Sequence, residues 1–276
     1  MISVFIITKD RPTQFLACLE SLRQNFGRFR THVLYKITNE ATRPYYKTFA
    51  KDTIDVEEIG DFKPALISTL KSIVTDLCLF LTDDTIFYRP LNPSLVGPVI
   101  SSFTNKDLFT FSLRLGENTT VQDIENPHIK LVVPPKLSEW NSSYHSWNWQ
   151  LQSLNSNCGY PISMDGHFYR TKDIIALSEQ IEFRNLREWE GNLIGHVRGN
   201  IDVPPLMSCL PLSYCVNVPF NFTQHPFTAT VGPYGISLAQ LNQKLIDGQK
   251  MDWQAMVQNI KICGSHQYLE SKFKSI

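Results

Sequence analysis

Two adjacent acids, Asp83 and Asp84, follow a wholly apolar run at Leu77–Leu81. Neighbouring carboxylates raise each other's pKa, so the pair is costly unless a cation joins it. Mg²⁺ or Mn²⁺ removes that repulsion and also binds phosphate oxygens. The alternative is that both aspartates cap the turn after a strand. Because an apolar run of this kind is typical of a central strand, we interpret the pair as a metal–diphosphate site.

A second polar cluster, Thr8 to Arg11, follows the β-branched run Ile2–Thr8. Ligands of an open parallel sheet bind beyond the carboxyl ends of its strands, so two central parallel strands would bring both clusters to one edge. The chain has neither a GxGxxG nor a GxxxxGK[ST] phosphate loop. A diphosphate would therefore depend on the metal and on cations such as Arg11 and Lys63. Their alternative role is that of solvated surface charges.

The elements that must position these residues alternate between strand and helix patterns over residues 1–110, which indicates a parallel sheet covered by helices. Four strands are predicted there: Ile2–Thr8, Thr31–Thr38, Ile54–Ile59 and Leu77–Leu81. Helices are predicted from Pro12, over Thr42–Lys51 and from near Phe62. The sequence thus predicts an α/β fold.

The later half has a looser pattern, and residues 114–160 are rich in Asn, Ser, Pro and Trp. Three further strands are predicted at Leu108–Leu113, Asp165–Arg170 and Cys215–Val218. Five further helices are predicted at Pro93–Phe103, Thr171–Gln180, Leu186–Arg198, Leu238–Leu245 and Trp253–Ile260. No repeat or linker divides the chain, so we expect one continuous domain over residues 1–276.

The composition is that of an ordinary globular protein, with 42% hydrophobic and 19% charged residues. Its 26 basic and 26 acidic residues cancel, which weighs against a nucleic-acid binder that works through a basic surface. No apolar run approaches the ~20 residues of a transmembrane helix, and the first strand lacks the flanks of a signal peptide. We therefore expect a cytoplasmic protein. Its 6 cysteines form no CxxC pair and are expected to be buried thiols.

Several segments, in this order, resemble family 2 and related GT-A glycosyltransferases. They are SVFIITKDRPTQFLACLESL, DFKPALISTL, LCLFLTDDTIF, SMDGHFYRTKDI, NLREWEGNL and LAQLNQKLIDGQKMDWQ. The resemblance implies a GT-A (Rossmann-like) fold with a mixed, mostly parallel sheet flanked by helices. It also implies a nucleotide-binding half at 1–110, and an acceptor-binding half with a closing segment at 111–276.

The same resemblance assigns roles to residues near the two strand ends. Thr8 and Arg11 match nucleotide contacts, Lys63 a basic position near the base or diphosphate, Asp83 the ribose-contacting acid and Asp84 the metal ligand. The chain departs from the family pattern at two places. Thr82 replaces the usual first acid of an Asp-x-Asp motif. The second strand is followed by Asn39 and Glu40, either of which would have to replace the acid that reads the base.

Downstream, Glu190 falls where inverting members place the catalytic base. Its neighbour Glu188 would point elsewhere on a helix, and the alternative for both is an exposed helix charge. Asp165, Gly166 and His167 fall on the strand that lines the sugar and acceptor side.

Two assignments come from side-chain chemistry. Trp147, near other aromatic residues, could stack on a sugar ring or pack in the core. His225, beside a proline, could be a late metal ligand or a structural residue.

These observations and the resemblance predict a metal-dependent inverting glycosyltransferase that moves a sugar from a nucleotide-diphospho-sugar, with UDP as the expected nucleotide, to a glycan or other hydroxyl acceptor. The cofactor would be Mn²⁺ or Mg²⁺, acting as a Lewis acid on the leaving diphosphate. One alternative is a nucleotidyltransferase of related fold, although the first strand lacks the Gly-rich basic loop of those enzymes. The other alternative is a catalytically inactive nucleotide-sugar or carbohydrate-binding module.

Overall fold

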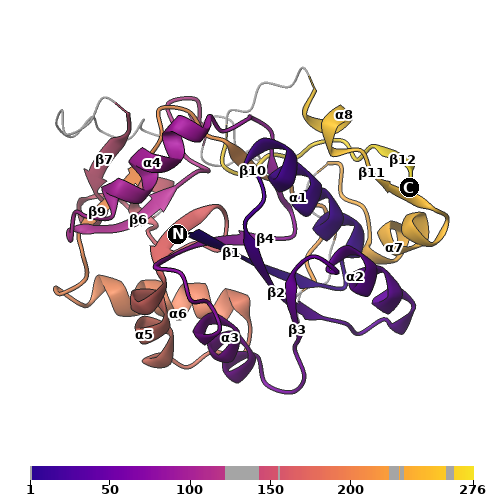
Figure 1. Ribbon diagram of the computed structural model, residues 1–276, viewed down its shortest axis with the longest axis horizontal. Coiled ribbons are helices and arrows are strands. Elements are labelled where there is room, and N and C mark those ends of the chain that lie inside the picture. Colours follow the sequence, from indigo (N-terminus) through magenta and orange to yellow (C-terminus); the bar gives the residue numbers. More distant parts are fainter. Residues whose placement is uncertain (1, 122–142, 155, 224–229, 231–232, 259–263) are drawn as a thin grey trace.

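A computed structural model describes residues 2–121, 143–154, 156–223, 230, 233–258 and 264–276. Its centre is an eight-stranded sheet in the order β3-β2-β1-β4-β8-β6-β9-β7 (Figure 1). The strands are β1 Ile2–Lys9, β2 Arg30–Lys36, β3 Ile54–Glu57, β4 Leu77–Thr82, β6 Leu108–Ser112, β7 His145–Asn148, β8 His167–Arg170 and β9 Leu206–Cys209.

The sheet is mixed and mostly parallel, as predicted. Strands β3, β2, β1 and β4 run parallel to one another, and β9 runs parallel to β6. Strand β8 is antiparallel to both β4 and β6, and β7 is antiparallel to β9. The register pairs Ile7 of β1 with Thr82 of β4, so these two strands end side by side.

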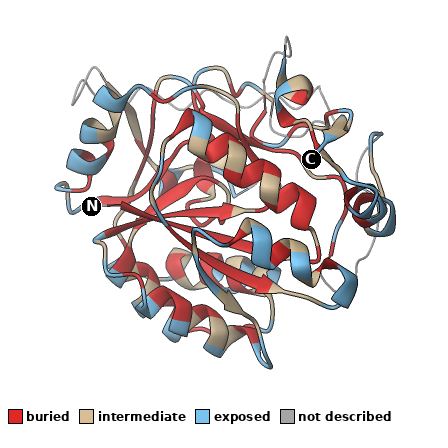
Figure 2. Ribbon diagram, turned by 45° about the vertical axis from the view of Figure 1, so that its right-hand side comes forward, coloured by how far each residue is buried: buried red, intermediate tan, exposed pale blue. Residues whose placement is uncertain are grey.

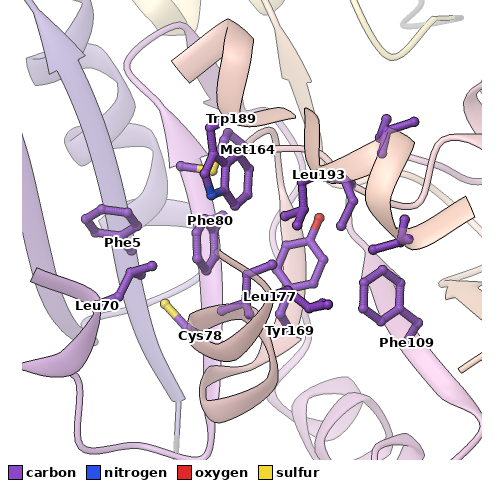
Figure 3. Close-up of a cluster of buried hydrophobic side chains, with 14 of the residues drawn as sticks. Phe5, Leu70, Cys78, Phe80, Phe109, Met164, Tyr169, Leu177, Trp189 and Leu193 are labelled. Atoms are coloured by element: carbon purple, nitrogen blue, oxygen red, sulfur yellow. The ribbon is translucent and has the colours of Figure 1, made fainter. Parts of the chain in front are cut away.

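Alternation along the two central strands divides the core into two faces. Phe5 and Phe80 point to a face covered by α3 Phe62–Lys71, α5 Thr171–Glu179 and α6 Leu186–Arg198 (Figure 3). Val4 and Leu79 point to the opposite face, covered by α1 Pro12–Asn25, α2 Arg43–Phe49 and α4 Pro93–Ser102. Burial is highest along the strands and the inner sides of these helices (Figure 2).

The C-terminal part adds a third core against the outer side of α1. Strand β10 Cys215–Asn217 pairs antiparallel with β5 Thr85–Phe87, directly after the acid pair. Strand β11 Gln249–Met251 pairs with β12 Phe273–Ser275. With α7 Leu238–Ile246 and α8 Trp253–Val257, these strands bury an apolar cluster whose members include Ala17, Ile86, Phe220, Leu241 and Trp253.

The predicted elements are confirmed, with differences at their ends. Strand β8 begins at His167, because Gly166 has a φ of +74° and turns the chain out of the extended conformation. The region 114–160 contains β7 and the 3₁₀ turns Trp149–Leu151 and Asn157–Gly159. A third 3₁₀ turn, Glu40–Thr42, precedes α2, and strands β5, β7, β9, β11 and β12 have no counterpart in the sequence prediction. The helix predicted at Trp253–Ile260 ends at Val257, where Gln258 becomes extended.

The five described cysteines are buried, as expected. Within the described ranges, no helix combines the length and apolarity that crossing a membrane requires.

Candidate functional site at the carboxyl ends of β1 and β4

The structure brings the two predicted polar clusters together. The Thr8 hydroxyl donates to Oδ2 of Asp83 at 2.7 Å, and Arg11 Nε donates to the same oxygen at 3.0 Å while its Nη2 donates to Oδ1. The Asp83 side chain is fully buried. Burial raises the pKa of Asp83 to about 6, although the charge of Arg11 acts in the opposite direction. Asp83 is therefore a buried carboxylate whose two oxygens are both engaged by protein donors.

The guanidinium of Arg11 makes its close contacts with other residues of the protein. Its Nη1 donates to the main-chain oxygen of Asn221 at 3.1 Å and lies 3.8 Å from Oδ2 of Asp84. All three guanidinium nitrogens thus have protein partners. The reason is charge balance, since a carboxylate as buried as Asp83 requires a counter-charge. In this arrangement Arg11 holds Asp83 and the C-terminal part in place, and the expected nucleotide contact would have to use the remaining N–H groups of Nη1 and Nη2.

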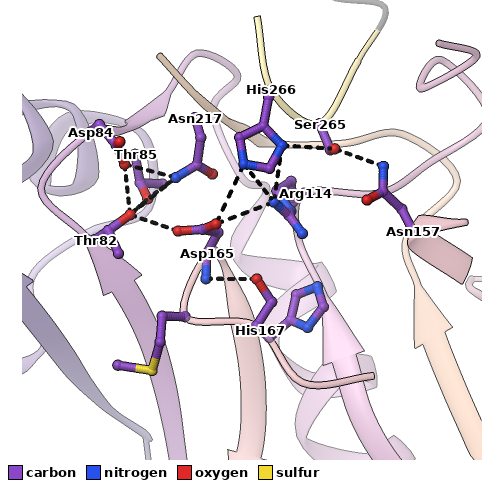
Figure 4. Close-up of polar contacts among 12 residues, drawn as sticks. Thr82, Asp84, Thr85, Arg114, Asn157, Asp165, His167, Asn217, Ser265 and His266 are labelled. Carbon is purple, nitrogen blue, oxygen red and sulfur yellow. Dashed lines mark hydrogen bonds and ion pairs between the residues drawn. The ribbon is translucent and has the colours of Figure 1, made fainter. Parts of the chain in front are cut away.

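Asp84 differs from its neighbour. Its Oδ1 accepts hydrogen bonds from Thr82 Oγ1 at 2.6 Å and from Asn217 Nδ2 at 2.9 Å (Figure 4). Its Oδ2 has only the distant Arg11 contact among the described residues. The side chain retains 14% exposure, so Asp84 has a carboxylate oxygen free to bind a ligand.

Asp165 reaches the same hydroxyl from the turn before β8. Its Oδ1 lies 2.6 Å from Thr82 Oγ1, as does Oδ1 of Asp84. A hydroxyl has a single proton to donate, so it satisfies one of these carboxylates at a time. The remaining short contact between oxygens is repulsive unless a cation or a proton neutralises it. Asp84 and Asp165 therefore fit a hard divalent cation, with Thr82 occupying the place of the missing first acid.

Arg114 and His266, which the sequence left without a role, face Asp165. Arg114 Nη1 lies 3.3 Å and His266 Nε2 lies 3.6 Å from Oδ2 of Asp165. Burial opposes ionisation of Asp165, but His266 and Arg114 together lower its pKa below the usual range. His266 is held over the site by main-chain bonds from Asn217 N to Ser265 O at 3.0 Å and from Gln267 N to Asn217 O at 2.9 Å.

Glu190 lies in the second turn of α6 and points to the same sheet edge. Its Oε1 accepts a hydrogen bond from the main-chain nitrogen of Met164 at 2.8 Å. Burial, together with the charge of Asp165, raises the pKa of Glu190 to about 8. Glu188 instead accepts from Arg184 at 2.8 Å on the surface. The structure therefore separates the two glutamates as the prediction required.

The remaining predicted residues near Asp165 shape the turn. A Cβ on Gly166 would lie 2.6 Å from the buried Cys215 sulfur, so only glycine fits this position. His167 is fully buried, and burial beside Arg114 lowers its pKa to about 3. His167 is therefore neutral at physiological pH and lies within the protein.

Two predicted contacts lie on the β2 and β3 side. Lys63 Nζ pairs with Glu182 at 2.7 Å, bridging α3 and the segment before α6. Asn39 caps the 3₁₀ turn by accepting from Ala41 N at 3.1 Å. Both side chains have local structural partners in this conformation.

Trp147 requires a correction. It is fully buried, and its indole nitrogen donates to the main-chain oxygen of Cys158 at 2.7 Å. Its ring belongs to the core face shared with Trp149 and cannot present a flat surface to a sugar. His225 lies outside the described residues.

The space around the acids indicates where a ligand can approach. A cavity of about 10 Å³ lies between the acid pair and residues of α1 and the C-terminal part, including Gln14 and Met251. That volume suits about one water molecule. A cavity of about 500 Å³ lies at the opposite end of β4, lined by residues that include Leu77 and Thr171. His266, beside Asp165, is 46% exposed, so the cluster reaches the surface on that side.

No group of three or more His, Cys, Asp or Glu side chains among the described residues is arranged to hold a metal ion. Mg²⁺ commonly needs only one or two carboxylates, because substrate phosphates and waters complete its shell. Asp84 and Asp165 fit that mode of binding.

No protein-family model matches the chain, and no curated protein matches its sequence. Solved structures with a similar arrangement include TarS of S. aureus, at 14% identity and a TM-score of 0.45 over 84% of this chain. A mycobacterial protein aligns over 89% of this chain and 72% of its own length, at 12% identity and a TM-score of 0.41. This chain spans 37% of the length of TarS. Similarities this weak do not bear on activity, which we infer from the side chains of this chain.

Proposed function

We propose that this chain is a GT-A-type glycosyltransferase that takes a sugar from a nucleotide-diphospho-sugar, with UDP as the nucleotide, and transfers it to a hydroxyl of a glycan or similar acceptor. The observation that carries the proposal is the convergence of three carboxyl groups at one sheet edge. Asp84 comes from the end of β4, Asp165 from the turn before β8 and Glu190 from α6. Sugar transfer needs carboxylates in two roles, one toward the leaving group and one toward the acceptor.

Asp84, assisted by Asp165, would hold Mn²⁺ or Mg²⁺, which when bound supplies positive charge next to the leaving diphosphate. These residues fit because two of their oxygens share one hydroxyl proton and because Oδ2 of Asp84 is unsatisfied by close contacts among the described residues. Asp83 has a structural role in this conformation, because its side chain is fully buried and Thr8 and Arg11 donate to both of its oxygens, which leaves neither oxygen exposed for the ribose contact that the resemblance implies.

Glu190 would act as the general base. The acceptor oxygen forms a bond to the anomeric carbon, the bond from that carbon to the β-phosphate oxygen breaks, and its electron pair leaves on the diphosphate. The acceptor proton passes to the Glu190 carboxylate. A base with a pKa near the working pH transfers protons most effectively, and burial raises the pKa of Glu190 to about 8. Attack from the side opposite the leaving group inverts the anomeric configuration.

The test is thermal unfolding with UDP, with UDP-linked sugars and with the corresponding nucleotides of other bases, each with and without Mn²⁺. A ligand at 100 times its Kd stabilises the folded state by about 2.7 kcal/mol, which for a chain of this size raises Tm by several degrees. We expect the shift with Mn²⁺ and a UDP-sugar in the wild type and in Asp52→Asn, which changes an exposed carboxylate. We expect no shift in Asp84→Asn.

A shift that persists in Asp84→Asn would contradict the metal assignment. The absence of any shift with every nucleotide would contradict the function. Nucleotide-sugar binding that is unaccompanied by transfer or hydrolysis, and unchanged in Glu190→Gln, would identify an inactive binding module.

A further inference from the structure

Arg114 is a buried cation with poor hydrogen bonding. Its side chain is 3% exposed and lies directly after β6. Its Nε is buried without a partner among the described residues. Its Nη1 has only long contacts, at 3.3 Å to Asp165 and at 3.3 and 3.5 Å to the ring nitrogens of His266. A buried guanidinium with so few strong partners is costly, so its presence requires an explanation.

Two other arginines near the sheet, Arg170 and Arg11, are half-buried, with 16% and 12% of their side chains exposed, and have stronger partners. Arg170 donates to three main-chain oxygens at 2.6 to 2.8 Å. Arg11 engages a carboxylate with two nitrogens and a main-chain oxygen with the third. Arg114 has neither arrangement, and it faces the exposed His266 at the mouth of the site (Figure 4). Such a lack of strong protein partners is expected of an arginine that binds a ligand.

The charges around Arg114 indicate the class of that ligand. Asp84 and Asp165 carry two negative charges and Arg114 one positive charge, which leaves a net charge of about −1. A divalent cation at the acids changes this to about +1, and the cluster then attracts an anion. Arginine matches phosphate oxygens with its planar fork. Of the predicted diphosphate contacts, Arg11 is bound to the buried Asp83, and Lys63 pairs with Glu182 on the surface.

We propose that Arg114, assisted by His266, binds the diphosphate oxygens of the donor and exchanges its long contact with Asp165 for them when the donor and a divalent cation are bound. This inference rests on the proposed function. It makes Arg114 the principal protein cation for the leaving group, delivered by β6, while the C-terminal segment delivers His266.

The experiment is calorimetric titration of UDP, uridine and inorganic pyrophosphate in the presence of Mn²⁺. A hydrogen bond to a charged group contributes about 1.5–3 kcal/mol, so Arg114→Gln should weaken UDP and pyrophosphate binding about 10- to 100-fold. Uridine affinity should be unchanged, because uridine lacks phosphate. His266→Asn should weaken UDP several-fold. The control is Arg198→Gln, which alters a half-buried arginine of α6 whose contacts are the main-chain oxygens of Gln152 and Gly159.

Equal UDP-to-uridine affinity ratios in wild type and Arg114→Gln would overturn the inference, leaving Arg114 as a counter-charge for Asp165. If Arg114→Gln does not fold, Arg114→Lys serves instead. It keeps the charge but loses the fork, and it should weaken UDP several-fold with uridine unchanged, whereas an unchanged ratio overturns the inference. If the wild type binds pyrophosphate with Mn²⁺ through Arg114 but no UDP, the anion site stands and the proposed function fails. If it binds neither, both fail.

Discussion

Asp83 and Asp84 are neighbours in the chain but belong to two different kinds of site. Asp83 is sealed beneath α1, where Thr8 and Arg11 satisfy both of its oxygens. The Tyr46 hydroxyl extends this network by contacting Thr8 at 2.8 Å and accepting from Arg11 N at 2.9 Å. Asp84 and Asp165 share the single hydroxyl proton of Thr82, and the neighbouring His266 is exposed to solvent. We call the first group the sealed region, and the second, comprising Asp84, Asp165, Glu190, Arg114 and His266, the open region.

These two regions both contain acids, but they differ in whether the hydrogen bonds of those acids are satisfied. That difference distinguishes a structural polar cluster from a ligand site. The sealed region has a carboxylate matched by a guanidinium, so removal of either partner is expected to damage the fold. The open region has two carboxylates on one hydroxyl and a buried guanidinium with long contacts. A bound cation would neutralise the two carboxylates, and an anionic substrate would accept hydrogen bonds from the guanidinium.

The largest expected effect is a loss of catalytic rate on substitution of a residue in the open region. Glu190→Gln removes the proposed base and should lower kcat about 10²- to 10⁴-fold, the usual contribution of general base catalysis. Donor affinity should change little. The measurement is sugar transfer with the UDP-sugar identified by thermal shift. Glu188→Gln is the matched control on the same helix, since Glu188 contacts Arg184 on the surface, and its kcat should stay near the wild-type value. Equal losses in both variants would contradict the assignment of Glu190.

The second effect is on the free energy of unfolding, which substitutions in the sealed region and the open region should change by different amounts. Asp83→Asn leaves the guanidinium of Arg11 without its counter-charge and should lower the free energy of unfolding by about 3 kcal/mol, as breaking a buried ion pair does. Asp84→Asn should cost clearly less, because it loses no close ionic partner and relieves repulsion with Asp165. Chemical denaturation of both variants without ligand provides the comparison. If Asp84→Asn is the more damaging of the two, the distinction between sealed and open regions is wrong.

The smallest expected effect is the pH dependence of stability. The pKa of Glu190 is about 8 in the folded protein, above that of an unfolded glutamate. The folded state therefore holds a proton that the unfolded state has released, and this contribution is fully present below about pH 4.5 and lost as the pH rises through 8. Relative to Glu190→Gln, which does not titrate, the wild type should lose at least about 1 kcal/mol between pH 5 and 8.5, since one pKa unit corresponds to about 1.4 kcal/mol.

Urea denaturation of both proteins across this pH range measures the difference. Transfer activity should rise over the same range, because only the ionised carboxylate accepts a proton. A stability difference that is constant with pH would show that Glu190 has an ordinary pKa in the fold.

Local patterns were sufficient to predict most of the fold. The apolar runs of β1 and β4, the proline at the start of α1 and the helical spacing in α3 and α6 are properties of neighbouring residues, and the structure places those elements where they were expected. The predicted proximity of Thr8 and Asp83 also followed, because parallel strands end at one edge. The short strands β5, β7, β9, β11 and β12 escaped prediction because each is only three or four residues long and pairs with a distant partner.

The sequence by itself determined the acid pair, its place after a buried strand and the glutamate on a later helix. Only the tertiary structure decided which acid is satisfied and which is open, since that depends on donors far away in the chain. Arg114, Asn217 and His266 are single polar residues in unremarkable surroundings, and no local spacing distinguishes them from surface residues. They become part of the site because the chain after β6 and the C-terminal segment bring Arg114 and His266 to Asp165, while β10 brings Asn217 to Asp84. Trp147 is the opposite case, a residue that the sequence assigned to the site and that the structure places in the core. Its ring type suits a sugar, but the ring is fully buried among other side chains.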